Sequence, residues 1–275
     1  MSAHEIRYVE ASLNYVAASS ERLRTYAFDP PAGTPRSNVV FEPHRVRIFD
    51  VRPVAPELDR EGFALVKKAT SVQDFSDQDA VRNVYYPEAE ALLLDTHTGA
   101  ERVVVFDHTV RRRLAGAIDR TSGVPRQPAL RVHNDYTEKS DPQRVRDLLG
   151  AEAESLLQKR FAIINVWRPL QGPVRDAPLA VCDAGSANPD DFVASDLIFR
   201  DRVGETYAVK YNPNHRWFYA PDMTEDEVWL LKCYDSNRDG TARFAPHTAF
   251  DDPAAPLNTP PRESIELRAF VFYGQ

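Results

Sequence analysis

Cysteine is scarce in this chain, and long apolar runs are absent. The only two cysteines, Cys182 and Cys233, lie far apart and form no CxxC pair. A disulfide framework or a thiolate metal site is therefore not expected. No apolar run reaches the roughly 18 residues that a membrane-spanning helix needs, so no membrane partner is expected. Residues 1–10 carry charges and no apolar segment, which predicts no signal peptide and a cytoplasmic location.

An excess of positive charge is also lacking. The chain has 34 Lys and Arg against 41 Asp and Glu, a net charge of −7 at pH 7. A nucleic-acid partner is not expected, because a phosphate backbone calls for a basic surface. The 27% of charged residues and 43% of hydrophobic residues are ordinary for a globular enzyme. Prolines outnumber glycines by 21 to 11, which suits a β-rich fold with structured loops.

Short segments rich in β-branched and aromatic residues predict strands throughout the second half of the chain. These predicted strands are 161–167, 179–182, 206–211, 216–219, 228–234 and 264–273. Earlier segments predict strands at 6–13, 45–51 and 102–107, a short helix at 87–94, and a longer helix that starts at Ser140 and ends near Arg160. Many short strands without intervening helices indicate a sandwich or barrel.

We expect a single domain over residues 1–275. Its mainly β core covers residues 100–275, and residues 1–100 supply an N-terminal arm and supporting elements. The arm is expected to be largely irregular up to about residue 45. Thr224 and Glu227 resemble a capping box, which predicts one helical turn before the strand at 228–234.

His133 and Asp135 form a His-x-Asp pair at the end of an extended segment. Residues two apart on a strand point to the same face, so this imidazole and carboxylate lie side by side. With a distant histidine they would form the two-His, one-carboxylate set that binds Fe(II) in non-heme oxygenases. A lone His-x-Asp also arises by chance. Asp107 and His108 cannot act in this way, because adjacent residues face opposite sides of a strand.

Two later histidines, His215 and His247, are candidates for the third ligand. We favour His247, because Arg262 and Ser264 follow it at the start of the last predicted strand. The planar guanidinium of an arginine pairs bidentately with a carboxylate, here the distal carboxylate of 2-oxoglutarate. The alternative for His247 is a loop histidine that caps a turn. The alternative for His215, a half-buried histidine beside Trp217, is the better interpretation of that residue.

Two further residues are candidates for binding the cosubstrate. Arg268 is the alternative partner of the distal carboxylate, since it can share a strand face with Arg262. A structural ion pair with Glu266 or Asp251 would explain Arg268 equally well. Tyr211 is a candidate for contact with the cosubstrate or the substrate.

Four segments of the chain resemble the CmcJ/asaB-like hydroxylase/desaturase family of secondary metabolism, within the Fe(II)/2-oxoglutarate-dependent oxygenase superfamily. They are VHNDYT (132–137), INVWRPLQGPVRDAPLAVCDAGS (164–186), YNPNHRWFYAPDMTEDEVWLLKCYDS (211–236) and ARFAPHTAFDDPAAPLNTPPRESIELRAFVF (242–272). The resemblance covers most of residues 80–275. The DDPAAPLNTPP insert makes the spacing from His247 to Arg262 longer than the superfamily commonly has.

The resemblance implies a double-stranded β-helix (jelly-roll) core with flanking helices and an iron site in the mouth of the barrel. It implies His133, Asp135 and His247 as the metal ligands and catalytic centre, and Arg262 with Ser264 as the 2-oxoglutarate site. The implied reaction uses Fe(II), 2-oxoglutarate and O2 to hydroxylate or desaturate a small secondary-metabolite-type substrate.

Rival functions remain open from the sequence. A non-catalytic jelly-roll that binds a small ligand or a protein would not need the complete ligand set. A non-heme iron oxygenase independent of 2-oxoglutarate would not need the Arg-x-Ser pair. A methyltransferase is disfavoured, because no Gly-rich loop follows a predicted strand. The substrate, the oxidative outcome and the oligomeric state, a homodimer included, also stay open.

Overall fold

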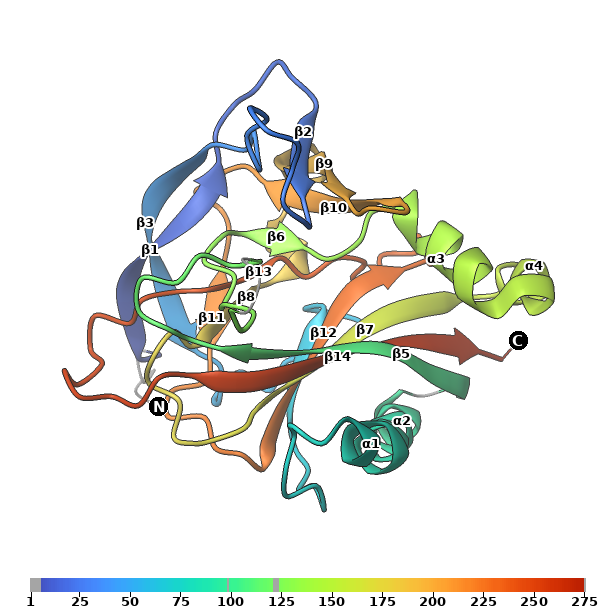
Figure 1. Cartoon of the computed structure of the whole chain (residues 1–275). Helices are drawn as coiled ribbons and strands as arrows, with labels where there is room; N and C mark the ends of the chain where they lie inside the picture. Colours follow the sequence, from blue (N-terminus) through green and yellow to red (C-terminus); the bar gives the residue numbers. More distant parts are fainter. Residues whose placement is uncertain (1–5, 98, 121–123, 275) are drawn as a thin grey trace.

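Two β-sheets face each other across a common interior in the computed structural model, which describes residues 6–97, 99–120 and 124–274 (Figure 1). The strands of the nine-stranded sheet are β1 (Tyr8–Val16), β2 (Leu23–Tyr26), β3 (Phe41–Asp50), β6 (His133–Asn134), β8 (Leu179–Cys182), β9 (Phe192–Ile198), β10 (Val203–Val209), β11 (Trp217–Tyr219) and β13 (His247–Ala249). The strands of the five-stranded sheet are β4 (Phe63–Lys67), β5 (Ala100–Arg112), β7 (Phe161–Pro169), β12 (Glu227–Asp235) and β14 (Glu263–Tyr273).

Strands distant in sequence are neighbours in both sheets. The order is β1-β3-β11-β8-β13-β6-β10-β9-β2 in the larger sheet and β4-β12-β7-β14-β5 in the smaller one. The helices are α1 (Gln78–Ala80), η1 (Val81–Tyr85), α2 (Tyr86–Thr96), α3 (Ser140–Leu149), η2 (Gly150–Glu152), α4 (Ala153–Leu156), η3 (Ala184–Ser186) and η4 (Pro189–Asp191). Figure 1 shows α1 and α2 beneath the five-stranded sheet and α3 and α4 at one end of the molecule. The mainly β jelly-roll expected from the sequence is confirmed.

Strand β14 shows how the sequence separates the two faces of the smaller sheet. Ile265, Leu267 and Ala269 belong to the apolar cluster that includes Ala89, Leu92 and Leu93 of α2, so they face outward under the helix. The residues that alternate with them, Ser264, Glu266 and Arg268, therefore face the interior of the barrel. The interior face of β14 is therefore polar over residues 264–268 and apolar at Phe270 and Phe272, whereas its helix-covered face is apolar throughout.

The larger sheet also has two distinct faces. Leu179 and Val181 of β8 pack with Trp167 of β7 in the barrel interior. Ala180 and Cys182 pack on the other face, in a cluster with Val132 and Trp217. Because Val132 faces outward, the next residue, His133, faces the interior.

The N-terminal segment is more regular than the sequence predicted. Strands β1 and β3 pair antiparallel from Tyr8 with Phe49 to Val16 with Phe41, and they extend the nine-stranded sheet. Strand β4 joins the five-stranded sheet beside β12. The expectation of an irregular arm up to about residue 45 was wrong, because the charged residues of β3 lie on its exposed face and hide the apolar alternation. Residues 1–5 of that arm lie outside the described residues.

The long helix predicted from Ser140 to about Arg160 is divided into α3, η2 and α4. Gly150 adopts φ = 52° directly after α3, a conformation that ends an α-helix and favours glycine. The hydroxyl of Thr137 accepts hydrogen bonds from the main-chain N–H of Lys139 (3.2 Å) and Ser140 (3.1 Å). Thr137 thus supplies capping contacts at the start of α3.

The turn before β12 is not helical. The carboxylate of Glu227 accepts a hydrogen bond from the N–H of Thr224 (2.9 Å), as in a capping box, but a plain turn leads into the strand.

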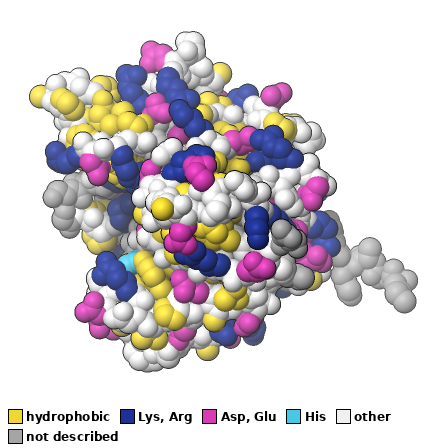
Figure 2. Space-filling view, turned by 90° about the vertical axis from the view of Figure 1, so that its right-hand side faces the viewer, with side chains coloured by type: hydrophobic (Ala, Val, Ile, Leu, Met, Phe, Trp, Pro, Cys, Tyr) yellow, Lys and Arg dark blue, Asp and Glu magenta, His cyan; other side chains and the backbone are white. Residues whose placement is uncertain are grey.

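No helix within the described residues is long and apolar enough to cross a membrane. On the face shown in Figure 2, Lys and Arg side chains lie among Asp and Glu side chains, so no large area of this face carries one sign of charge.

Asp141 in the first turn of α3 generates a prediction about the pH dependence of stability. Its carboxyl group is fully buried, and both oxygens lack a hydrogen-bond partner among the described residues. Burial raises the pKa of this carboxyl group well above its ordinary value. The stabilising contribution of such a group is therefore present below about pH 4, and it is lost as the pH rises through the folded-state pKa. We expect Asp141→Asn to raise Tm relative to the wild type at pH 8 but not at pH 4.

Differential scanning calorimetry of both proteins at the two pH values measures this effect. Asp147→Asn in the same helix is the matched control, because Asp147 is exposed and bonds only to Gln143. It should change Tm equally at both pH values. An equal change for Asp141→Asn would contradict the prediction.

Candidate metal centre

Three side chains with metal-ligand chemistry converge in the barrel interior from two adjacent strands. His133 begins β6, Asp135 follows it by two residues, and His247 begins β13. Strands β6 and β13 pair through the two histidines. One ligand atom from each of the three residues lies within 4.8 Å of the other two, and His133 Nε2 is 3.6 Å from Asp135 Oδ1. The set that the sequence suggested is thus brought together in space.

Hydrogen bonds fix which nitrogen of each imidazole is free. Nδ1 of His133 donates to the carbonyl of Arg131 (2.8 Å), and Nδ1 of His247 donates to the carbonyl of Ala245 (3.0 Å). A neutral imidazole that carries its proton on Nδ1 has an unprotonated Nε2 available to a metal. Burial, followed by the charges of His247 and Arg131, lowers the pKa of His133 well below its ordinary value. His133 is therefore a neutral imidazole that can act as a ligand.

One oxygen of Asp135 is held by neighbouring side chains. Oδ2 accepts hydrogen bonds from Arg268 Nε (2.9 Å) and Asn165 Nδ2 (3.3 Å), whereas Oδ1 faces His133. Burial opposes ionisation of this carboxyl group, but the charge of Arg268 and the hydrogen bond from it lower its pKa below the usual range. Asp135 is therefore an ionised carboxylate with a fixed orientation.

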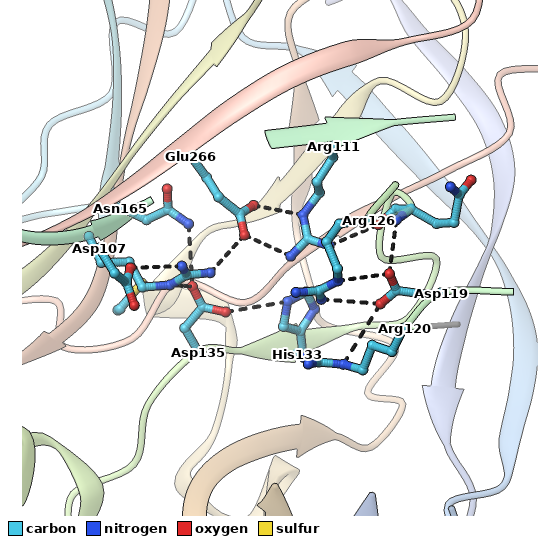
Figure 3. A network of polar contacts seen from close by, with 12 residues as sticks. Asp107, Arg111, Asp119, Arg120, Arg126, His133, Asp135, Asn165 and Glu266 are labelled. Atoms are coloured by element: carbon cyan, nitrogen blue, oxygen red, sulfur yellow. Dashed lines mark hydrogen bonds and ion pairs between the residues drawn. The ribbon is translucent and has the colours of Figure 1, made fainter. Parts of the chain in front are cut away.

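A network of charged side chains, among them Asp107, Arg111 and Glu266, lies beside Asp135 (Figure 3). Arg268 belongs to this network. Its Nη1 donates to Asp107 (3.0 Å) and its Nη2 to Glu266 (2.7 Å). Glu266 also accepts two hydrogen bonds from Arg111, at 3.0 Å and 2.7 Å. Arg111 in turn donates to the carbonyl of Gln127 (2.8 Å). The sequence had offered Arg268 as a cosubstrate ligand or as a partner of Glu266, and the structure places it against Glu266, Asp107 and Asp135.

Arg262 and Ser264 have unused hydrogen-bonding groups in the interior. Both side chains are buried, and Arg262 Nε and Ser264 Oγ have no partner within the part of the chain that the structure describes. Arg262 Nη1 donates to the carbonyl of Ala177 (2.5 Å), and its guanidinium lies over the ring of Trp167, 5.4 Å from the ring centre. Burial and the charge of Arg111 lower the pKa of Arg262 to about 9, so it still carries a proton at neutral pH.

Tyr211 is not brought to this centre. It lies beyond the end of β10, is 39% exposed, stacks on His44 with ring centres 4.0 Å apart, and contacts Tyr15 edge-on. Tyr15 belongs to the cluster on the outer face of the nine-stranded sheet, opposite to His133. His215 lies on the same outer side and bonds to Tyr15 (3.2 Å) and Asp191 (3.1 Å). The interpretation of His215 as a packed structural histidine fits this position.

A cavity of about 390 Å³ opens beside His133 and Asp135. Its wall includes arginines that the sequence did not single out, namely Arg111, Arg120, Arg126 and Arg131. These residues lie on β5 and on the connection from β5 to β6, which carry no recognisable motif. The local sequence gave no signal that they would meet the His-x-Asp pair.

A jelly-roll that gathers two imidazoles and one carboxylate at one end of its interior is the architecture of the mononuclear non-heme iron oxygenases. A buried guanidinium with an unused Nε and a hydroxyl, neither of these two atoms having a partner among the described residues, add a receptor for an anion in the same interior. The fold and the site thus define the class of protein.

Comparisons with known proteins agree. The family model described as "Oxidoreductase/YMDC permease-like domain" matches residues 13–272. The hydroxylase/desaturase efuI of Hormonema carpetanum is 35% identical, covering 96% of this chain and 95% of its own. The Fe(II)/2-oxoglutarate-dependent dioxygenase nvfI of Aspergillus novofumigatus is 34% identical over 91% of both chains. A solved structure of the iron and alpha-ketoglutarate-dependent endoperoxidase NvfI, W199F variant, matches with a TM-score of 0.89 at 32% identity over 100% of both chains.

This chain belongs to the Fe(II)/2-oxoglutarate-dependent dioxygenases, in the family of the hydroxylase/desaturases efuI and asaB. It is an enzyme whose cofactor is Fe(II) and whose cosubstrate is 2-oxoglutarate.

The buried pair of Arg111 and Glu266 generates a prediction about stability. We expect Arg111→Met to lower the free energy of unfolding by about 2–3 kcal/mol, because Glu266 stays buried with one partner fewer. The double variant Arg111→Met/Glu266→Met should recover part of that loss, since it removes the buried charge as well. Urea unfolding measures the three free energies.

The same strands offer a matched control in Arg112, which pairs with Glu263 at 2.9 Å with its own side chain 53% exposed. Arg112→Met should cost less than about 1 kcal/mol, because an exposed ion pair is screened by water. Equal losses for the two single variants would show that the interior network does not hold Glu266.

Proposed function

We propose that His133, Asp135 and His247 hold the ferrous ion of this dioxygenase. The observation that carries the assignment is the free donor set. Both imidazoles use Nδ1 on a backbone carbonyl, and Asp135 uses Oδ2 on Arg268, which leaves two Nε2 atoms and one carboxylate oxygen in one place. Three protein donors of this kind suit Fe(II) and leave coordination positions open.

The same proposal gives the distal carboxylate of 2-oxoglutarate to Arg262 and Ser264. Support comes from the unused Nε and Oγ of this pair, which are the donors a carboxylate needs. Arg268 is the weaker choice, because three carboxylates already accept hydrogen bonds from its guanidinium. The guanidinium of Arg262 also packs on the ring of Trp167.

Bound Fe(II) and 2-oxoglutarate together activate O2 to oxidise a substrate C–H bond, with succinate and CO2 as coproducts. The residues of the chain position these reactants. Arg268 and Asn165 hold Asp135 in one orientation, the carbonyls of Arg131 and Ala245 hold the two imidazoles, and Arg262 fixes the far end of the cosubstrate. We propose that the substrate is a small secondary-metabolite-type molecule that is hydroxylated or desaturated, as the names of the relatives suggest.

We also propose that residues 1–275 act as one oxygenase domain in the cytoplasm. The N-terminal strands β1 and β3 extend the sheet that carries β6 and β13, and β4 extends the opposite sheet, so the N-terminal part supports both walls of the site. Cys182 and Cys233 are both buried and unpaired, which suits a reducing compartment.

Removing either imidazole tests the metal assignment. We expect His133→Ala and His247→Ala to lose Co(II) binding, and to lose the weak visible charge-transfer band that Fe(II) and 2-oxoglutarate give without oxygen. His44→Ala is the control, because His44 lies away from the centre against Tyr211. Absorption titrations of the purified proteins measure both signals. A normal band in either alanine variant would remove that histidine from the ligand set.

The cosubstrate assignment has its own test. Arg262→Leu should raise the Kd of 2-oxoglutarate by about 10- to 100-fold, the loss expected for a charged hydrogen bond, and should leave Co(II) affinity nearly unchanged. The Kd of 2-oxoglutarate for Arg262→Lys should lie between those of the wild type and Arg262→Leu, because lysine keeps the positive charge but lacks the planar guanidinium. Calorimetric titration of the metal-loaded proteins under argon gives these values. An unchanged Kd in Arg262→Leu would rule out Arg262 as the distal-carboxylate partner.

A further inference from the structure

The charged groups on β5, on β14 and on residues 119–135 form two halves of opposite character, and the cavity is also lined by Lys139, Arg144, Asp147, Asp196, Arg202 and Glu205. The half next to the proposed iron site contains the guanidiniums of Arg268 and Arg111 and the carboxylates of Asp107, Asp135 and Glu266. Three negative groups thus surround two positive ones. An excess of negative charge is what a site for a divalent cation requires.

The other half has the opposite balance. Arg126 pairs with Asp119 through two contacts of 2.9 Å and 3.1 Å, and Arg120 lies 3.9 Å from the same carboxylate. Figure 3 shows Asp119 between these two arginines. Arg131 also lines the cavity, and no carboxylate of the described residues lies within 4.0 Å of its guanidinium. Three positive groups therefore share one negative group, although a partly buried charge is unfavourable without a partner.

The main chain around Arg131 is held firmly beside the metal ligands. Its carbonyl accepts the hydrogen bond from His133 Nδ1 (2.8 Å). The neighbouring peptide groups bond to Asn14, with Val132 N–H donating to the Asn14 carbonyl (2.9 Å) and Asn14 Nδ2 donating to the carbonyl of Leu130 (2.7 Å). An anion on the Arg131 side chain would thus be held by a main-chain segment that also fixes a ligand of the iron.

Part of the remaining cavity wall is apolar. Tyr136 follows the His-x-Asp pair, and Leu197, Phe199 and Val203 come from β9, β10 and the turn between them. Val203 is 65% exposed, which places this hairpin at the open side of the cavity. A ligand in the cavity can therefore contact both the arginines and these apolar side chains, which share the wall with other polar residues.

Resting on the proposed function, we infer that the substrate is an amphipathic small molecule with a carboxylate group, which Arg131 binds while the apolar body lies along Tyr136, Leu197 and Phe199. The two anion sites then have separate tasks. Arg262 and Ser264 take the cosubstrate carboxylate in the barrel interior, and Arg131 takes the substrate carboxylate at the cavity wall. Arg131 is thereby a specificity-determining residue, because the position of the carboxylate decides which C–H bond lies next to the iron.

Matched pairs of small aryl carboxylic acids and their methyl esters test this inference. The probes are 1-naphthylacetic acid, naproxen and dehydroabietic acid, each with its ester. Equilibrium dialysis against the full-length protein, loaded with Co(II) and 2-oxoglutarate under argon, gives the ratio of ester Kd to acid Kd. We expect the wild type to bind at least one acid tenfold or more tightly than its ester. A wild type without acid preference in any pair overturns the inference.

Three variants connect the preference to Arg131. Arg131→Leu should reduce the ratio to about one, and Arg131→Lys should restore part of it. Arg144→Met is the matched control, because Arg144 also lines the cavity but lies over the ring of Phe106, and it should keep the wild-type ratio. A wild-type ratio in Arg131→Leu overturns the inference.

Two further measurements keep this inference separate from the proposed function. Arg131→Leu must bind Co(II) as the wild type does, which shows that the fold and the metal site are intact. Arg262→Leu should weaken 2-oxoglutarate and retain the acid preference in the presence of saturating cosubstrate. If Arg131→Leu weakens 2-oxoglutarate and keeps the acid preference, Arg131 serves the cosubstrate and the inference fails. Loss of Co(II) binding in His133→Ala would still support the proposed iron site.

Discussion

The geometry of the site depends on one backbone pairing, that of β6 with β13 through His133 and His247. These strands are two and three residues long, so their register is set by the longer strands around them. A slip of one residue would turn an imidazole to the outer face, where Val132 and Cys182 pack in an apolar cluster. The apolar outer face of this sheet thus determines the position of the polar ligands on its inner face.

In the five-stranded sheet, the two faces of β14 likewise differ in polarity. Ile265, Leu267 and Ala269 of β14 bury apolar surface under α2, which stabilises the sheet from outside. On the other face of β14, Ser264, Glu266 and Arg268 are polar or charged and face the barrel interior, whereas Phe270 and Phe272 farther along belong to an apolar cluster. Around residues 264–268 the interior is polar and can receive ligands, while apolar clusters fill other parts of it, such as the one that contains Trp167. Buried carboxylates and guanidiniums compensate one another there, and Arg262 and Ser264 keep free donors.

The parts of the structure that were predictable from sequence follow from the two-residue period of a strand. That period placed His133 beside Asp135, separated Asp107 from His108, and identified residues 179–182, which coincide with β8. Asp107 indeed contacts Arg268 in the interior, whereas His108 bonds to Tyr86 (2.8 Å). The same argument failed for Tyr211, because β10 ends at Val209 and the alternation ends with it. The partners of Arg111 and the position of Arg131 at the cavity could not be predicted, since both depend on contacts between segments far apart in the chain.

Arg268 connects the structural network to the chemistry of the metal site. By donating to Oδ2 of Asp135 it leaves Oδ1 as the oxygen that faces His133, which favours a carboxylate that binds the metal through one atom. A carboxylate that bound through both oxygens would occupy a further coordination position, and fewer would remain for cosubstrate and O2. Arg268 can impose this orientation because Asp107 and Glu266 hold its other nitrogens. In the proposed iron site, the excess of carboxylates around Arg268 would therefore have two roles, because it would orient Asp135 as a ligand and supply negative charge for the cation.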